Sequence, residues 1–309
     1  HYFFNDQSHT MDAVVRNKCE HELLSIFKDA AARLEINFEL ESEALGEGGI
    51  KEVWNFIGNN SQQLTLILLA ATLILSRVPA SNEKFNKLRE TELNLSIEEK
   101  KLNIKKIKRE MEHGDCKDID IDELSKIIND YLKIRKHKSN FYNYLMSYSK
   151  VSKISTKGLS ENNEEIISKK TVERKDFYKF ILQTDELSAE IDDQAVIEII
   201  SPVLKSGNYK WKGLYDSEAI SFYMKDKDFK LSIIRDGVKF KNGSNIECVL
   251  EKSRKIDNTG EIIISGYSVT TVMKKTDDSE SFSTPQGERY KRIQKEKKRQ
   301  YNMFEDNEQ

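Results

Sequence analysis

The residues of this sequence that could take part in chemistry are few and form no complete catalytic set. Cys19 and His21 lie two positions apart on an expected helix, where side chains at that spacing point to different sides. The other cysteines, Cys116 and Cys248, have only one histidine, His113, near either of them in sequence. We therefore assign no catalytic residue, no metal site and no cofactor. The sequence favours a non-enzymatic protein while leaving catalysis open.

If the protein is an enzyme, three acidic residues on expected strands are the candidates for a catalytic site. Glu198 lies in "AVIEIISP", and Glu247 and Glu251 lie in "NIECVLEK", each near lysines. A metal-dependent nuclease needs carboxylates that converge on a divalent cation. Strand alternation instead places Glu247 and Glu251 on one face together with Val249, which favours the solvated face of a half-covered sheet.

A strand that combines basic and aromatic residues is the first candidate for ligand binding. Trp211 stands between Lys210 and Lys212, so a nucleotide base could stack on the indole ring while the lysines contact phosphate. The alternative is that Trp211 packs inward and the two lysines face water. Strand alternation is compatible with both arrangements.

A basic tail is the second candidate. The segment "ERYKRIQKEKKRQ" has seven Lys or Arg residues against two Glu residues. Such a segment binds nucleic-acid phosphates or anionic lipid headgroups, unless it is simply a solvated tail. The residues that we single out in it are Lys291, Arg292 and Lys295.

The apolar run "LTLILLAATLIL", residues 64–75, stands out from a chain in which 33% of residues are charged. A helix of this length spans about 18 Å, whereas a membrane span needs about 20 residues, so a simple single span is disfavoured. Three arrangements remain: a helix buried in the fold or in an oligomer, a membrane-inserted or bilayer-thinning segment, and a buried strand. The residues expected to contact lipid or a sister subunit are Leu64, Leu66, Ile67, Leu68, Leu73, Ile74 and Leu75.

Composition narrows the class of protein. The formal net charge of -2 over 309 residues argues against a nucleic-acid binder that uses its whole surface. Three widely separated cysteines indicate a reducing compartment, and the first residues lack the pattern of a signal peptide. We expect a cytoplasmic protein, associated with the inner membrane if the apolar run inserts.

Periodicity predicts an α+β protein in six parts. The parts are a small α/β module at 1–58, an apolar helix at 59–80, long charged helices at 81–149, a linker at 150–171, an antiparallel β-rich domain at 172–276 and a basic tail at 277–309. In the first part, "HYFF" and "INFELESEAL" read as strands and "IKEVWNFIG" as a helix.

The β-rich part contains five or six short strands, one of them "GVKFKNG", and a single helix at "KDFKLSII". Turn residues separate the strands, with Asp216 and Ser217 forming one such turn. This pattern predicts a partly closed sheet or a small barrel.

The charged helical part carries a short heptad pattern. Ile97, Ile104 and Met111 are seven residues apart, which allows packing against one partner helix. The region is either a solvated connector or a site of self-association, and the second alternative leads us to expect a homo-oligomer.

Two C-terminal segments carry a resemblance to known proteins. The sequences "NYKWKGLYDSEAISFYMKDKDF" and "VKFKNGSNIECVLEKSRKIDNTGEIIISGYSVTTV" resemble a β-domain of a group of uncharacterised bacterial proteins. In that group the domain follows a small α/β domain and a short apolar segment, and the same order occurs here. The resemblance covers most of the chain but transfers no catalytic residue. Proteins of the group are encoded among mobile-element and anti-phage defence genes, which implies a defence role by association.

These observations favour a membrane-associated, non-enzymatic interaction or effector protein of antiviral defence. Its apolar segment would anchor it, its charged helices would oligomerise, and its β-domain would sense a partner protein or ligand. The alternative is a soluble nucleic-acid-binding protein or nuclease that uses the β-domain and the basic tail. A third hypothesis is a soluble scaffold whose apolar segment is buried in a homo-oligomer.

Overall fold

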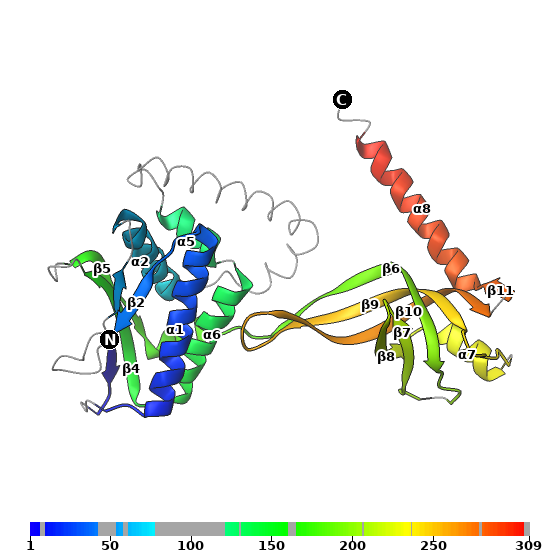
Figure 1. Ribbon diagram of the computed structural model, residues 1–309, viewed down its shortest axis with the longest axis horizontal. Helices are drawn as coiled ribbons and strands as arrows, with labels where there is room; N and C mark the ends of the chain where they lie inside the picture. Colours follow the sequence, from blue (N-terminus) through cyan, green and yellow to red (C-terminus); the bar gives the residue numbers. More distant parts are fainter. Residues whose placement is uncertain are drawn as a thin grey trace. The chain divides into compact units, whose positions relative to one another are not determined.

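The computed structural model divides the chain into two compact units, each with its own hydrophobic core (Figure 1). Unit 1 comprises His1–Asp185 and Ile256–Glu261, and unit 2 comprises Glu186–Lys255 and Ile262–Gln309. Both helices and strands are present, as the predicted α+β class requires. The structure describes residues 1–6, 10–42, 54–57, 61–77, 121–129, 131–159, 165–205, 207–235, 237–277 and 280–305.

Unit 1 packs helices against a small antiparallel sheet. The sheet has the order β1-β4-β5, a separate antiparallel pair joins β2 to β3, and a 3-10 helix, η2, follows β5. The bounds are β1 (Tyr2–Phe4), α1 (Ala13–Leu34), β2 (Glu39–Ser42), β3 (Trp54–Ile57), α2 (Ser61–Ser76), α5 (Ile121–Asn129), α6 (Leu132–Ser147), β4 (Val151–Leu159), β5 (Glu165–Glu173) and η2 (Arg174–Phe180).

Helix α6 lies in the middle of unit 1. Five consecutive residues, Arg135 to Ser139, are buried, which requires neighbours on every side of the helix. Lys136 forms an ion pair with Asp185 at 2.7 Å, and His137 Nδ1 lies 2.6 Å from a carboxylate oxygen of Glu22 on α1. The charged residues of α6 are therefore points of contact inside the unit and do not form a solvated face.

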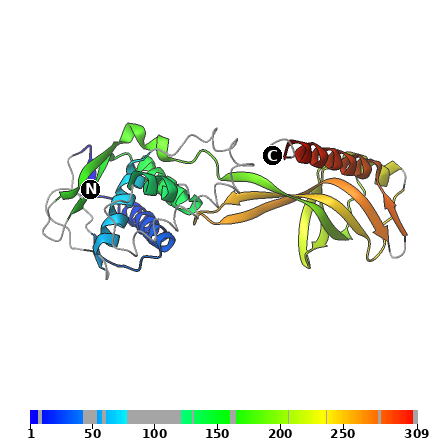
Figure 2. The same ribbon diagram turned by 90° about the horizontal axis from the view of Figure 1, so that it is seen from above.

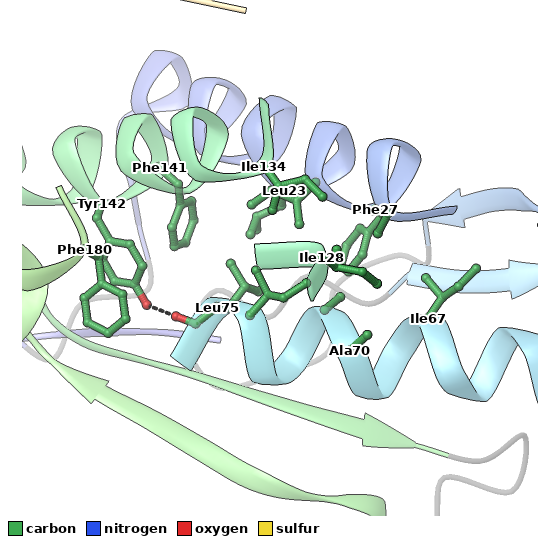
Figure 3. Packing of buried hydrophobic residues seen from close by; sticks show 14 of the residues in the cluster. Leu23, Phe27, Ile67, Ala70, Leu75, Ile128, Ile134, Phe141, Tyr142 and Phe180 are labelled. Carbon is green, nitrogen blue, oxygen red and sulfur yellow. Dashed lines mark hydrogen bonds between the residues drawn. The ribbon is translucent and has the colours of Figure 1, made fainter. Parts of the chain in front are cut away.

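Helix α2 contains the apolar run and lies in the core of unit 1. Figure 3 shows its apolar face directed at Phe27 of α1 and Ile128 of α5. Each fully buried Leu or Ile side chain contributes about 1.5–3 kcal/mol to folding. The α2 residues that are at most 4% exposed are Leu66, Ile67, Ala70, Ala71, Ile74 and Leu75.

The C-terminal end of α2 is satisfied by side chains of α6. The last carbonyl groups of a helix have no donor within the helix and need one from elsewhere. Tyr142 donates its hydroxyl proton to the carbonyl of Leu75 at 2.5 Å (Figure 3). Lys138, which is fully buried, donates to the carbonyls of Ile74 at 3.3 Å and Arg77 at 3.0 Å. A cation at a helix C-terminus is also favourable because it opposes the helix dipole.

Two predictions for unit 1 are wrong. The segment 150–171 is not a linker, because β4 and most of β5 lie in it and pair with each other. The strands were not predicted because the sequence is rich in Ser and Lys, and few of its apolar side chains, such as Val151 and Ile154, face the core. Residues 54–57 of "IKEVWNFIG" form strand β3 and no helix, because they pair with β2. The preceding residues of that segment, and the heptad at 97–111, lie outside the described residues.

Unit 2 contains a closed barrel of five strands, which confirms the predicted small barrel. The order around the barrel is β10-β8-β7-β6-β9, and pairing of β9 with β10 closes it. β8 and β10 run parallel, whereas β6–β7, β6–β9 and β7–β8 are antiparallel. The strands are β6 (Glu186–Ser201), β7 (Lys210–Tyr215), β8 (Glu218–Met224), β9 (Asn245–Ile256) and β10 (Ile262–Asp277), with helix α7 (Lys227–Arg235) between β8 and β9.

The connectivity of this barrel is that of the oligonucleotide/oligosaccharide-binding (OB) fold. In chain order the strands are arranged 1-2-3-5-4-1, the third and fifth are parallel, and a helix joins the third to the fourth. The OB-fold is a five-stranded Greek-key barrel that presents the face of its second and third strands to ligands. Here those strands are β7 and β8.

Local sequence explains the hairpin of β7 and β8. Asp216 and Ser217 both have positive φ, 50° and 66°, as a two-residue type I′ turn requires. This confirms the turn predicted at these residues. Gly213 in β7 allows close approach to β6, since a Cβ atom there would lie 2.5 Å from a methyl carbon of Ile197 and 2.7 Å from the carbonyl of Glu198.

The other elements of unit 2 pack against the barrel. Helix α7 occurs at the predicted "KDFKLSII", and its Phe229 lies in the barrel core. Residues 237–243 of "GVKFKNG" form no strand, because they pair with no strand among the described residues, although Phe240 packs against the barrel core. Strand β11 (Glu280–Ser283) pairs with β10, and helix α8 (Pro285–Glu305) follows it.

Three strands continue beyond the β7–β8 hairpin as a twisted ribbon, visible in Figures 1 and 2, which we call the arm. β6 pairs with β7 only over Glu198–Ser201, and β10 pairs with β8 only over Tyr267–Val269. The arm consists of residues 186–194 of β6, 250–255 of β9 and 262–266 of β10, with β9 in the centre.

Candidate functional site

The outer face of β7 and β8 is the candidate site. Side chains of paired residues in an antiparallel sheet lie on the same face and alternate along each strand. The inward pairs include Trp211 with Phe222, both fully buried. The outward pairs are therefore Lys210 with Tyr223, Lys212 with Ser221 and Leu214 with Ala219.

Trp211 does not serve as the candidate stacking residue, and the alternative of inward packing with both lysines facing water is the arrangement observed. Its side chain is 0% exposed, and its ring lies 5.6 Å from Phe240 and 6.5 Å from Phe229. Its Nε1 has no hydrogen-bond partner among the described residues, which marks an indole placed for packing. Side chains alternate between the two faces of β7. Because Trp211 faces the core, the neighbouring Lys210 and Lys212 face outward.

The two lysines predicted on either side of it are in position to bind an anion. Lys210 and Lys212 are exposed, and no carboxylate forms an ion pair with either among the described residues. The ammonium group of Lys210 lies 5.1 Å from the ring centre of Tyr223. A half-buried aromatic ring with an ammonium beside it offers a stacking surface next to a positive charge.

The loop before β7 is held by a contact from α7. Lys230 donates to the carbonyl of Gly207, and Tyr209 at the end of the loop is 52% exposed. In OB-folds this first loop borders the ligand face. Lys225, at the end of β8, forms an ion pair with Glu251 at 2.9 Å. Among the described residues of β7 and β8, Lys210 and Lys212 are thus the lysines that extend outward without an ion pair to a carboxylate.

The predicted basic residues of the tail lie on helix α8. Lys291, Arg292 and Lys295 are all exposed. The helix begins at a cap where Thr284 Oγ1 accepts the N–H of Gly287 at 3.0 Å. The first turn of α8 is therefore capped, and the basic side chains farther along the helix are exposed to solvent.

The acids considered for a nuclease do not converge. Glu251 pairs with Lys225 at 2.9 Å, and Glu247 lies 3.4 Å from Lys274. Glu198 is paired with Leu214 on the β7 side. No group of three or more metal-binding side chains occurs among the described residues. The arrangement gives no support to a metal-dependent nuclease.

The two cysteines among the described residues, Cys19 and Cys248, are both buried. Cys19 is fully buried in the core of unit 1 on α1, where it contributes to packing. Burial raises the pKa of Cys248, so its thiol stays protonated at neutral pH. His9 and Cys116 lie outside the described residues.

A polar cluster at the end of β7 holds the barrel strands together. Tyr215 donates to Asp192 at 2.6 Å, which lowers the pKa of Asp192 and raises the pKa of Tyr215. Lys252 lies 5.0 Å from the Tyr215 ring and 3.2 Å from Glu190. The bond to Tyr215 raises the pKa of Lys252 above its usual range. The cations and anions of this cluster are mutually satisfied, so we assign it a structural role.

Most of the apolar segment is buried within unit 1. Of the seven residues predicted to meet lipid or a sister subunit, four lie in the core of unit 1 and three are half-buried. No helix among the described residues has the length and apolar character that crossing a membrane requires. The buried four are Leu66, Ile67, Ile74 and Leu75, and the half-buried three are Leu64, Leu68 and Leu73.

Comparison of the chain with protein-family models, with curated proteins and with solved structures finds no match. The candidate site is therefore judged by its own chemistry.

Sequence reasoning identified Lys210 and Lys212 but missed Tyr223. The signal was present, because "EAISFYMK" alternates and the turn at Asp216-Ser217 sets the register opposite Lys210. Reasoning from sequence also missed the buried Lys138, since a lysine in a charged stretch gives no local sign of burial.

Proposed function

We propose that the barrel binds single-stranded nucleic acid on the outer face of β7 and β8. The observation that carries this proposal is that burial of Trp211 directs Lys210 and Lys212 outward on the ligand face of an OB-type barrel. Tyr223 lies on the same face beside Lys210. This combines a phosphate contact with a ring on which a base can stack.

The shape of the face suits an extended strand. Lys210 and Leu214 are four residues apart on β7, about 13 Å at the rise of a β-strand. The partners along this length become smaller, from Tyr223 to Ser221 and Ala219. A single strand with unstacked bases can place a base on Tyr223 and its phosphates near the lysines, which a rigid duplex cannot do.

Helix α8 supplies a second source of positive charge in the same unit. Exposed basic residues that meet phosphates add affinity that is independent of sequence and falls with salt. We assign Lys291, Arg292 and Lys295 this supporting role.

The membrane-anchored effector favoured by the sequence gains no observation in its support. Four of its seven anchor residues lie in the core that α2 forms with α1 and α5, so their insertion would require this core to open. The role in antiviral defence that the resemblance implies stays a prediction.

The binding proposal is tested with a labelled single-stranded oligonucleotide and the full chain, by fluorescence anisotropy at several salt concentrations. We expect the double variant Lys210→Gln/Lys212→Gln to bind about tenfold more weakly at low salt. Its slope of log affinity against log salt should fall by about 1.4, because each single-strand phosphate contact contributes about 0.7. Replacing Tyr223 with Leu should cost about tenfold through lost stacking.

A matched control removes the same charge elsewhere in unit 2. Lys227 and Lys239 are exposed and lie outside β7 and β8, so Lys227→Gln/Lys239→Gln should bind as the wild type does. Equal weakening in both double variants would show non-specific attraction and overturn the site. No binding at low salt, or displacement of the oligonucleotide by anionic lipid vesicles at similar charge concentration, would overturn the proposal itself.

A further inference from the structure

One edge of the arm exposes a row of apolar side chains. Ile262, Ile263 and Ile264 of β10 are 49%, 38% and 46% exposed. On one side β10 pairs with β9, while its pairing with β8 begins only at Tyr267. Among the described residues, segment 262–266 therefore has no strand beyond it. Its free backbone N–H and C=O groups are a template for another strand.

The two edges of the arm differ in charge. Soluble proteins protect exposed strand edges with charged residues or proline, which obstruct pairing with another chain. The β6 edge has four acids and no base over 186–193, at Glu186, Glu190, Asp192 and Asp193. Segment 262–269 of β10 has neither a charged residue nor a proline. Only the β10 edge lacks this protection.

We propose that Ile262–Gly266 of β10 pairs in antiparallel fashion with the same segment of a second copy of this chain. The charges select this occupant and this edge. Pairing of two β6 edges would place two segments with only acidic charge side by side, which is unfavourable even though Glu190 and Asp192 have partners within unit 2. Pairing of β10 with β6 would leave a free edge on each copy and generate an open chain, whereas β10 with β10 closes after two copies.

The side chains of the segment fit a two-fold arrangement. A pair centred on Ile264 places Ile264 opposite its own counterpart and Ile262 opposite Gly266. The glycine gives the larger side chain room on the shared face. The product is a six-stranded sheet made of two arms, in which the exposed isoleucines leave water together. The proposal locates the predicted homo-oligomer at β10, whereas the sequence suggested the charged helices or the apolar segment of α2.

The mass of the full chain in solution, measured by sedimentation, tests this proposal. We expect twice the mass of one chain, 35.9 kDa, at a concentration where Ile264→Lys sediments as a single chain. The matched control is Ile191→Lys on the β6 edge, where the isoleucine is 54% exposed. This control should keep the wild-type mass. Tryptophan emission checks that each variant is folded, and Ile262→Lys repeats the test at a second position.

Three results would overturn the proposal. A wild-type chain that stays monomeric at high concentration removes the interface. Equal dissociation by Ile191→Lys and Ile264→Lys indicates pairing of β10 with β6. A dimer that resists both Ile264→Lys and Ile262→Lys uses another surface. The measurement needs no oligonucleotide, so its outcome is independent of the nucleic-acid proposal.

Discussion

Two apolar segments of the chain, helix α2 and Ile262–Ile264 of β10, lie in opposite surroundings. In α2, one side of the helix is buried against α1 and α5, so its apolar character contributes to the core of unit 1. In the arm, Ile262–Ile264 lie on a strand edge and remain exposed. A helix buries side chains when neighbours surround it, whereas an edge strand leaves them open unless another strand arrives. Apolar character alone therefore does not tell where a segment is buried.

The same contrast holds for lysine. Lys138 is fully buried and bonded to carbonyl groups at the end of α2, whereas Lys210 is exposed and carries no ion pair among the described residues. Lysine therefore satisfies buried carbonyl groups in unit 1, whereas in unit 2 it presents its charge to solvent.

The largest effect is expected from truncation in the buried apolar segment. Ile67→Ala should lower the free energy of unfolding of unit 1 by about 3 kcal/mol, because the side chain is fully buried and leaves a cavity. Ile262→Ala on the exposed edge should change unit 2 by less than about 0.5 kcal/mol in the monomer. Urea unfolding read by hydrogen exchange and mass spectrometry scores each unit separately. Equal losses of unfolding free energy in Ile67→Ala and Ile262→Ala would contradict the contrast between the buried and the exposed segment.

The stability costs of replacing Lys138 and Lys210 should differ by somewhat less. Lys138→Met should cost unit 1 about 2 kcal/mol, since two helix carbonyls and Asn129 lose a charged donor in the interior. Lys210→Met, the matched exposed change, should leave stability within about 0.5 kcal/mol and weaken oligonucleotide binding. If Lys138→Met proves neutral, the ammonium does not stabilise the end of α2.

A smaller effect isolates one hydrogen bond. Tyr142→Phe keeps the ring, which stacks on Phe180 at 4.2 Å, and removes only the hydroxyl that donates to Leu75. The expected cost is about 1 kcal/mol in unit 1, with no change in unit 2. Thermal unfolding of the variant beside Tyr144→Phe, whose ring is half-buried on the same helix, provides the comparison. Similar values for both variants would argue against a special role for Tyr142.

The smallest expected effect is on the pH dependence of the stability of unit 2. Burial acts to raise the pKa of Asp277, but its bonds to Lys275 and Ser244 outweigh burial and lower that pKa. A carboxyl whose folded-state pKa is depressed stabilises the fold above its ordinary value and loses that contribution as pH falls through the folded pKa. Unit 2 should therefore weaken below about pH 4, and Asp277→Asn should flatten this dependence. Unfolding of unit 2 measured from neutral to acid pH checks this expectation, and an unchanged slope in the variant contradicts it.

Elements defined by their own periodicity were predictable. Helices α1, α2 and α7 follow from helical apolar spacing, and the barrel strands follow from alternation and the Asp216-Ser217 turn. Strands β4 and β5 were missed because few of their residues face the core, and "GVKFKNG" alternates without a partner strand to pair with. For the candidate site, the sequence drew attention to Lys210 and Lys212 and allowed inward packing of Trp211, but it did not point to Tyr223.

The sequence by itself determined which segments are apolar, which alternate and which carry charge, because these properties belong to residues and their spacing. Only the tertiary structure decided which way each segment faces. The barrel turns Trp211 inward and its lysines outward, since one strand has two faces and closure assigns one of them to the core. Likewise α1, α5 and α6 pack around α2, and pairing of β8 with β10 begins only at Tyr267 and so does not cover Ile262–Ile264. Burial depends on neighbours distant in sequence, and the local pattern contains no record of them.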